Sequence, residues 1–78
     1  RAMTKHEHRG FTLELDRDGD NTVYADISKG DFVGSLAMVE DLGTLDHYDD
    51  WSKTPMRVPQ STVEFFQKCE EEFLAMTD

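Results

Sequence analysis

The chain has 78 residues, of which 17 are acidic and 8 are basic, so its formal net charge at neutral pH is −9. This length suits one small domain, and the charge has the wrong sign for direct binding to nucleic acid. A hydrophobic fraction of 37% and a charged fraction of 32% exclude a membrane span and a low-complexity fibre. We therefore expect residues 1–78 to form a single small acidic domain.

The first nine residues, RAMTKHEHR, are polar and predict a flexible arm over residues 1–9. Arg1 and Ala2 are interpreted as residues from an expression vector, ahead of a native start at Met3. The N-terminal segment holds no apolar run of signal-peptide length, and a single cysteine excludes a disulfide framework within the chain. These features predict a cytoplasmic protein.

Two runs of alternating apolar and polar residues predict a β-hairpin. Residues 11–16 (FTLELD) and residues 22–27 (TVYADI) each place their apolar side chains on one face. The segment DGDN at 18–21 joins them and is rich in residues that favour turns.

Residues 32–39 (FVGSLAMV) are apolar at most positions, which predicts a central strand covered on both faces. A short helix over residues 36–39 is the competing interpretation, because Ala, Leu and Met favour helices. A strand with two apolar faces needs two covers, whereas the pattern predicts only one helix. We therefore expect a homodimer, formed through the uncovered sheet face or an edge strand.

The last segment predicts an amphipathic helix from Ser61 to Met76. Ser61 is expected to be the N-cap, with Glu64 completing a capping box. Helical periodicity gathers the apolar side chains on one arc, so Phe66 and Phe73 should point at the sheet. The same arc holds Phe65, Cys69 and Met76.

Gly43 is expected to turn the chain before a short fourth strand over residues 44–48, and residues 56–58 lead extended into Pro59. Together these elements predict an α+β fold. It is a three- to four-stranded antiparallel sheet, made of the N-terminal hairpin and a central strand, with one C-terminal α-helix packed on one face.

Two segments contain part of a metal-binding pattern, and neither completes one. Residues 16–20 carry acids at the first, third and fifth positions of a calcium loop, but Asn21 and Ile27 replace its glycine and its bidentate glutamate. His6 and His8 would supply two zinc ligands in a chain that has three histidines. We therefore predict no metal and no cofactor.

Catalytic patterns are also missing from the sequence. It contains no phosphate-binding loop, nucleophile elbow or metalloprotease motif. Cys69 lies within the apolar arc and is expected to be a buried, inert thiol. These observations favour a non-catalytic protein.

Residues 40–51 (EDLGTLDHYDDW) hold five acids and no base. Tyr48 and Trp51 would anchor a partner there, while Asp46, Asp49 and Asp50 would steer one that is basic. An alternative interpretation is that the two aromatic side chains cap the open end of the core.

The expected function is therefore to bind and regulate a basic or nucleic-acid-binding protein, with no direct contact to nucleic acid or membrane. The alternative is a small-molecule-binding domain or small enzyme whose pocket forms at a homodimer interface. A concave apolar pocket with convergent polar groups would favour the alternative.

Overall fold

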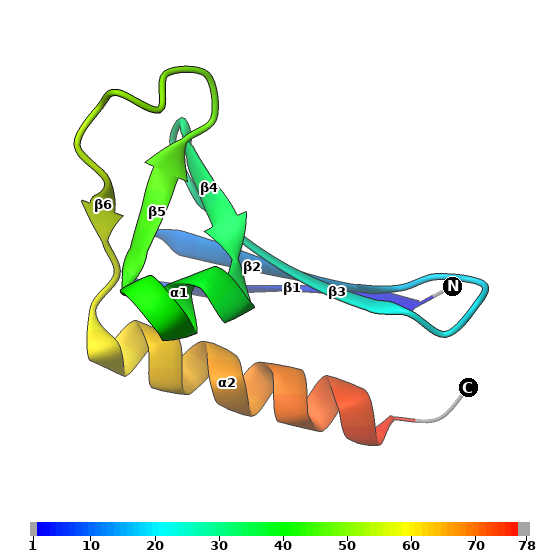
Figure 1. Ribbon diagram of the computed structural model, residues 1–78. Coiled ribbons are helices and arrows are strands. Elements are labelled where there is room, and N and C mark those ends of the chain that lie inside the picture. The colour runs from blue at the N-terminus through cyan, green and yellow to red at the C-terminus, as the bar shows by residue number, and fades with distance from the viewer. Residues whose placement is uncertain (1, 77–78) are drawn as a thin grey trace.

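A computed structural model describes residues 2–76, which form two helices and one antiparallel sheet whose six strands lie in chain order (Figure 1). The strands are β1 (Ala2–His8), β2 (Phe11–Arg17), β3 (Val23–Lys29), β4 (Phe32–Ser35), β5 (Thr44–His47) and β6 (Met56–Arg57). The helices are α1 (Leu36–Leu42) and α2 (Gln60–Ala75). The α+β class is confirmed, whereas the prediction of three to four strands and one helix is wrong.

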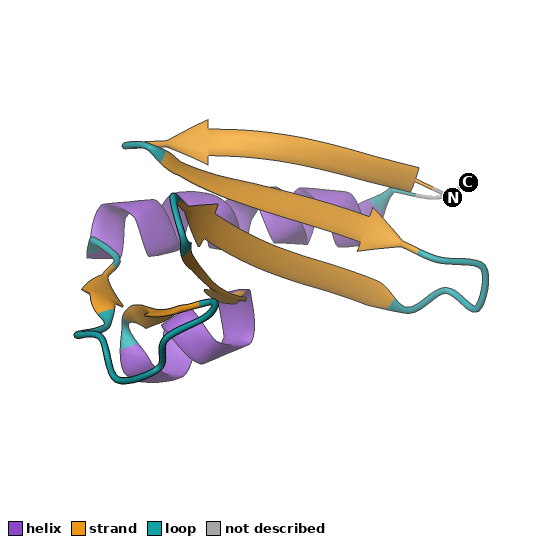
Figure 2. Ribbon diagram, turned by 90° about the horizontal axis from the view of Figure 1, so that it is seen from above, coloured by secondary structure: helices purple, strands orange, loops and turns teal. Residues whose placement is uncertain are grey.

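The sheet is bent rather than flat. The long strands β1, β2 and β3 lie side by side, and β4 and β5 rise steeply from them (Figure 1). Helix α2 runs along one face of the long strands, and α1 lies at the foot of β4 and β5 (Figures 1 and 2). The other face of the long strands, which we call the outer face, is left uncovered by the described part of the chain.

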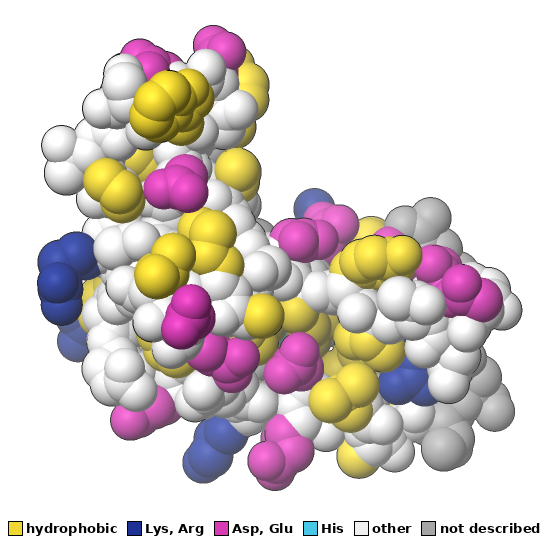
Figure 3. Space-filling view, in the orientation of Figure 1, with side chains coloured by type: hydrophobic (Ala, Val, Ile, Leu, Met, Phe, Trp, Pro, Cys, Tyr) yellow, Lys and Arg dark blue, Asp and Glu magenta, His cyan; other side chains and the backbone are white. Residues whose placement is uncertain are grey.

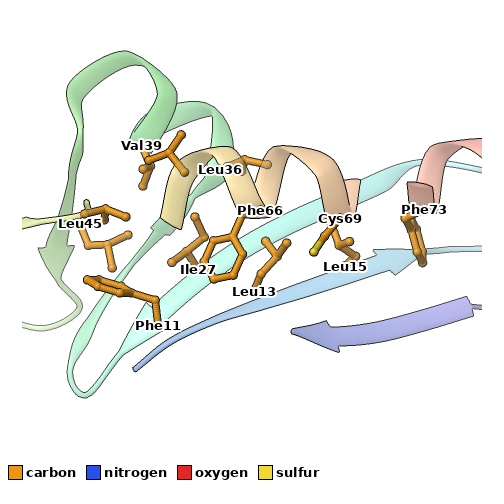
Figure 4. Close-up of a cluster of buried hydrophobic side chains, with 12 residues drawn as sticks. Phe11, Leu13, Leu15, Ile27, Leu36, Val39, Leu45, Phe66, Cys69 and Phe73 are labelled. Carbon is orange, nitrogen blue, oxygen red and sulfur yellow. The ribbon is translucent and has the colours of Figure 1, made fainter. Parts of the chain in front are cut away.

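The core lies between α2 and the inner face of the sheet (Figure 4). The predicted hairpin is confirmed, and its alternation sends every second residue of β2 into this core. Phe66 of α2 is fully buried at the centre of the layer. The buried apolar residues are Phe11, Leu13, Leu15, Ile27, Leu36, Val39, Leu45, Val58, Val63, Phe66, Cys69 and Phe73.

The predicted flexible arm is instead the edge strand β1, which pairs with β2 along its whole length. Its last residue, His8, stacks on Phe65 of α2 at 5.0 Å and forms a 2.7 Å hydrogen bond with the hydroxyl of Thr62. A local pattern does not show these contacts, because the partners lie more than fifty residues away in the sequence. Of the two residues interpreted as vector-derived, Ala2 belongs to β1, and Arg1 lies outside the described residues.

Residues 32–39 do not form one strand, and the helical interpretation of residues 36–39 is confirmed. The hydroxyl of Ser35 accepts a hydrogen bond from the backbone N–H of Met38 at 3.0 Å and so caps α1. Gly34 allows the helix to fold back closely, because a β-carbon there would lie 2.6 Å from Met38 and 3.1 Å from Leu45. The second half of the apolar segment is therefore a helix, so no strand with two apolar faces forms, and this removes our first reason for expecting a dimer.

Helix α2 begins before the predicted N-cap, and Ser61 does not cap it. Pro59 takes that position with an extended backbone, at φ −58° and ψ 145°, and makes no side-chain cap hydrogen bond. Its carbonyl oxygen instead accepts the N–H groups of Thr62 and Val63 at 3.0 and 3.1 Å. Because the chain arrives extended from β6 and proline disfavours continuation of a helix on its N-terminal side, the turn is set at Pro59.

The predicted inner face of α2 is confirmed for Phe66, Cys69 and Phe73 and wrong for two residues at its margin. Phe65 is 39% exposed and Met76 is 50% exposed. Phe65 faces the edge of the sheet, where the ring of His8 is its stacking partner.

We expect Phe73→Ala to lower the free energy of unfolding by about 3–5 kcal/mol, because it empties a buried site beside β2. The Phe73 ring is 2% exposed and lies 5.4 Å from the guanidinium carbon of Arg17. The adjacent Leu74 is 52% exposed, so Leu74→Ala should change stability by less than about 0.5 kcal/mol. Urea unfolding followed by circular dichroism measures both, and a loss below about 1 kcal/mol for Phe73→Ala would show that the buried face is wrong.

Candidate functional site

The loop of residues 48–55, which joins β5 to β6, carries the two predicted aromatic anchors at the surface. Trp51 is 88% exposed and Tyr48 is 66% exposed. This loop lies at the end of the raised part of the sheet, away from α2 (Figure 1). Hydrophobic and acidic side chains stand next to one another at that end of the molecule (Figure 3). The interpretation that Tyr48 and Trp51 cap the core is therefore wrong.

His47, the last residue of β5, holds the start of this loop. Its Nδ1 atom accepts hydrogen bonds from the backbone N–H groups of Asp49 and Asp50, at 3.2 and 2.9 Å. The imidazole side chain is only 9% exposed, and it packs edge-on to Phe32 at 5.3 Å and against Tyr48 at 5.4 Å. Because Nδ1 is the acceptor, that nitrogen is the unprotonated one.

Asp50 stabilises the next turn of the loop. Its Oδ1 atom accepts hydrogen bonds from the hydroxyl of Ser52 at 2.6 Å and from the Ser52 backbone N–H at 3.1 Å. Its carbonyl oxygen accepts the backbone N–H of Lys53 at 3.0 Å. The hydrogen bonds from the hydroxyl and the backbone N–H of Ser52 hold the pKa of Asp50 below its ordinary value. Asp50 therefore has a structural role within the loop.

Asp46 and Asp49 are exposed, and neither carboxylate forms a hydrogen bond or ion pair with the described residues. Asp46 lies on β5 opposite Val33, and Asp49 follows in the loop. Their negative charges are therefore available to a partner. The structure thus brings all five predicted site residues to one end of the molecule. Two are exposed aromatic side chains, two are carboxylates without a hydrogen-bond or ion-pair partner among the described residues, and one carboxylate stabilises the loop.

His47 was not among the predicted site residues, although its side chain orders the start of the loop. A histidine followed by two aspartates two and three positions later could have indicated a side chain that caps its own loop. The pattern is short and common, so by itself it does not identify a histidine that orders a loop. The packing of Phe32 against the imidazole ring is seen only in the structure.

A second feature lies on the outer face, where the sheet bends. It is an open hollow of about 350 Å³ in the corner between the long strands and β4. Its wall combines carboxylates, hydroxyls and aliphatic groups, contributed by Glu14, Asp26, Ile27, Ser28, Val33, Gly34 and Ser35. This hollow is concave, as the small-molecule alternative requires, but its polar side chains include two carboxylates of like charge.

The acidic turn between β2 and β3 uses its carboxylates to stabilise itself. Asp18 accepts hydrogen bonds from the backbone N–H groups of Asp20 and Thr22, at 3.1 and 3.3 Å. Asp20 accepts from Thr22 at 3.0 Å, and hydrogen bonding with Asp18 and Thr22 lowers the pKa of Asp20 to about 2. Residues 2–76 contain no group of three or more side chains arranged to hold a metal ion.

The thiol of Cys69 is buried among the core residues. Burial, together with the nearby charge of Glu72, raises its pKa above the ordinary value. A thiol that resists ionisation is a poor nucleophile, which agrees with the expectation of an inert side chain.

Searches of protein-family models, of curated proteins and of solved structures find no match to this chain. Neither helix of the described chain is long and apolar enough to cross a lipid bilayer.

We expect His47→Ala to loosen the loop and His47→Asn to preserve much of its order. An asparagine side chain can place an acceptor oxygen near the position of Nδ1, whereas alanine leaves the N–H groups of Asp49 and Asp50 without their acceptor. Hydrogen exchange measured by NMR should therefore be faster at these two amides in the alanine variant than in the asparagine variant. Equal exchange rates in the two variants would contradict the role of His47.

Proposed function

We propose that this protein binds a basic protein, including one that itself binds nucleic acid, and regulates it by occupying its surface through the loop of residues 48–55. The function is non-catalytic. The observation that carries the proposal is an 88% exposed tryptophan, Trp51, on a loop whose first residues are ordered by hydrogen bonds to the side chains of His47 and Asp50. We further propose the cytoplasm as its compartment, where the free thiol of Cys69 stays reduced.

The anchor argument rests on what Trp51 contributes when a partner covers it. Tryptophan and tyrosine are enriched among the few interface residues that supply most of the binding energy. In the free protein the indole of Trp51 is in water, so a partner that buries it gains a large apolar area. Because His47 and Asp50 already order the loop, less conformational entropy is lost on binding than with a flexible segment.

The charge argument concerns how a partner reaches the loop. A net charge of −9 on a chain of this size attracts a basic surface over a distance of about one Debye length. The free carboxylates of Asp46 and Asp49 stand beside the anchors. Charges at the rim of an interface act mainly on the rate of association and on its salt dependence.

The proposal predicts different kinetic effects for the anchor and for the charges. The probes are purified basic nucleic-acid-binding domains, immobilised for surface-binding measurements. Trp51→Ala should raise the dissociation rate about 30-fold, the change expected for a hot spot worth about 2 kcal/mol. Its control, Leu74→Ala, also removes an exposed apolar side chain and should have no effect. Intrinsic fluorescence reports directly on burial of the Trp51 indole by the partner, because Trp51 is the only tryptophan of the chain.

The double variant Asp46→Asn, Asp49→Asn should slow association and flatten its salt dependence while leaving dissociation almost unchanged. A matched control, Asp41→Asn with Glu71→Gln, removes two exposed acids from the helices. Equal effects of the two double variants would indicate attraction by net charge alone. Binding that survives Trp51→Ala without any change in dissociation would contradict the proposed site.

We also propose that the protein forms a homodimer, through β1. The outer face is poorly suited to self-association, because it would bring Glu14 and Asp26 against the same acids of a second copy. Strand β1 is a seven-residue edge without proline, and its outer backbone groups can pair with another strand.

Light scattering over a concentration series should therefore give a mass that rises from 9.0 kDa toward twice that value. Added salt should favour the dimer by screening the repulsion between two acidic chains. A mass of 9.0 kDa at every concentration and salt would refute the dimer.

A further inference from the structure

We propose that the hollow on the outer face receives an arginine-bearing segment of the basic partner, with the guanidinium group held by Glu14 and Asp26. The inference rests on the proposed function for the class of partner, but it concerns a different surface from the loop of residues 48–55. It follows from the geometry of the sheet, from the charges across its strands and from the apolar groups beside them.

Strand β4 rises from the plane of the long strands (Figure 1), and the hollow lies between the residues of β2, β3 and β4 that line it. Acidic side chains lie along the upper side of the long strands in the view of Figure 3, with hydrophobic side chains among them. A volume of about 350 Å³ is at the lower end of the range found for sites that enclose a small ligand. It therefore has room for one long side chain and part of the backbone that carries it.

Glu14 and Asp26 are direct cross-strand partners on β2 and β3. Like charges placed opposite each other destabilise a sheet. Lys5 offsets one of the two, since its ammonium group lies 3.6 Å from a carboxylate oxygen of Glu14. On the other side, Asp26 is opposite Ser35, and its carboxylate makes no hydrogen bond or ion pair with residues 2–76. Across β1, β2 and β3 there are thus one base and two acids side by side. Asp26, the acid without a pairing base, lines the hollow.

Exposed apolar side chains stand next to these carboxylates. Val33, in the wall of the hollow, is 41% exposed, and Tyr24, two residues before Asp26 on the same face of β3, is 48% exposed. An arginine side chain combines an apolar stem with a planar group that binds carboxylates through paired hydrogen bonds. Its stem can pack on Val33 while its guanidinium group reaches Asp26, and the ring of Tyr24 offers a face for stacking.

The same features argue against other occupants. A second copy of this acidic chain would bring carboxylates onto carboxylates, and the described residues hold no cluster suited to a metal ion. Lysine would match the charge, but it lacks the planar group that can contact two carboxylates at once. The chemistry therefore favours arginine on a protein segment.

The test uses the full chain and NMR titration with a short peptide in which arginine alternates with glycine, compared with its citrulline counterpart. The arginine peptide should shift the amide signals of Asp26, Val33 and their neighbours on β3 and β4, and the citrulline peptide should not. Asp26→Asn should weaken binding about tenfold, as expected for loss of a charge-assisted hydrogen bond. Asp41→Asn, which removes one exposed acid from α1, is the matched control and should change the affinity much less.

A second measurement separates this site from a merely structural role of Asp26. Asp26→Asn should raise the melting temperature of the free protein, because it removes one of two opposed like charges, while the affinity falls. The inference would be overturned if Asp26→Asn and Asp41→Asn lost affinity equally, or if the peptide shifted only amide signals on other surfaces. A lowered melting temperature of Asp26→Asn would also overturn it.

The two proposals can fail separately. If Trp51→Ala abolishes binding to the basic domains and Asp26→Asn does not change the affinity for the arginine peptide, the hollow is rejected as a binding site and the loop is retained. If Trp51→Ala has no effect and Asp26→Asn weakens peptide binding, the loop is rejected as a binding site and the hollow is retained as the arginine-binding surface.

Discussion

The packing of α2 on the long strands is the contact on which the rest of the structure depends. Phe66 is fully buried at its centre, and Phe73 and Cys69 continue the same buried line toward the end of the helix. A chain of 78 residues has little apolar material for any other core. Strand β1 also depends on this layer, since His8 reaches it through Phe65 and Thr62. Loss of this packing would therefore also remove the contacts that join the end of the edge strand to the helix.

The break after β4 gives the molecule its surface features. Gly34 and Ser35 end the strand and start α1, so the chain turns back instead of extending the sheet in one plane. Strand β5 then continues the raised part of the sheet, and the loop of residues 48–55 follows at its end. The same bend makes the outer face concave. One short segment thus accounts for both the exposed position of Trp51 and the hollow beside Asp26.

Two groups among the acidic residues differ in what their charge does. Asp18, Asp20 and Asp50 accept hydrogen bonds from neighbouring backbone groups and stabilise turns. Asp26 and Asp46 form no hydrogen bond or ion pair within the described part of the chain. The carboxylates of the second group repel one another in the free protein. They would attract the positive charges of a basic partner. This difference is the physical basis of both binding proposals.

Local patterns in the sequence were sufficient for the hairpin, for the fourth strand near residues 44–48 and for the apolar face around Phe66. They were sufficient because side-chain alternation and helical periodicity depend only on neighbouring residues. The stretch 40–51 could likewise be selected as the candidate site from its composition. The edge strand β1, the helix after Ser35 and the exposure of Trp51 were decided by the tertiary structure. Each depends on contacts between residues distant in sequence, and an apolar or aromatic residue has the same local signature whether or not another element comes to cover it.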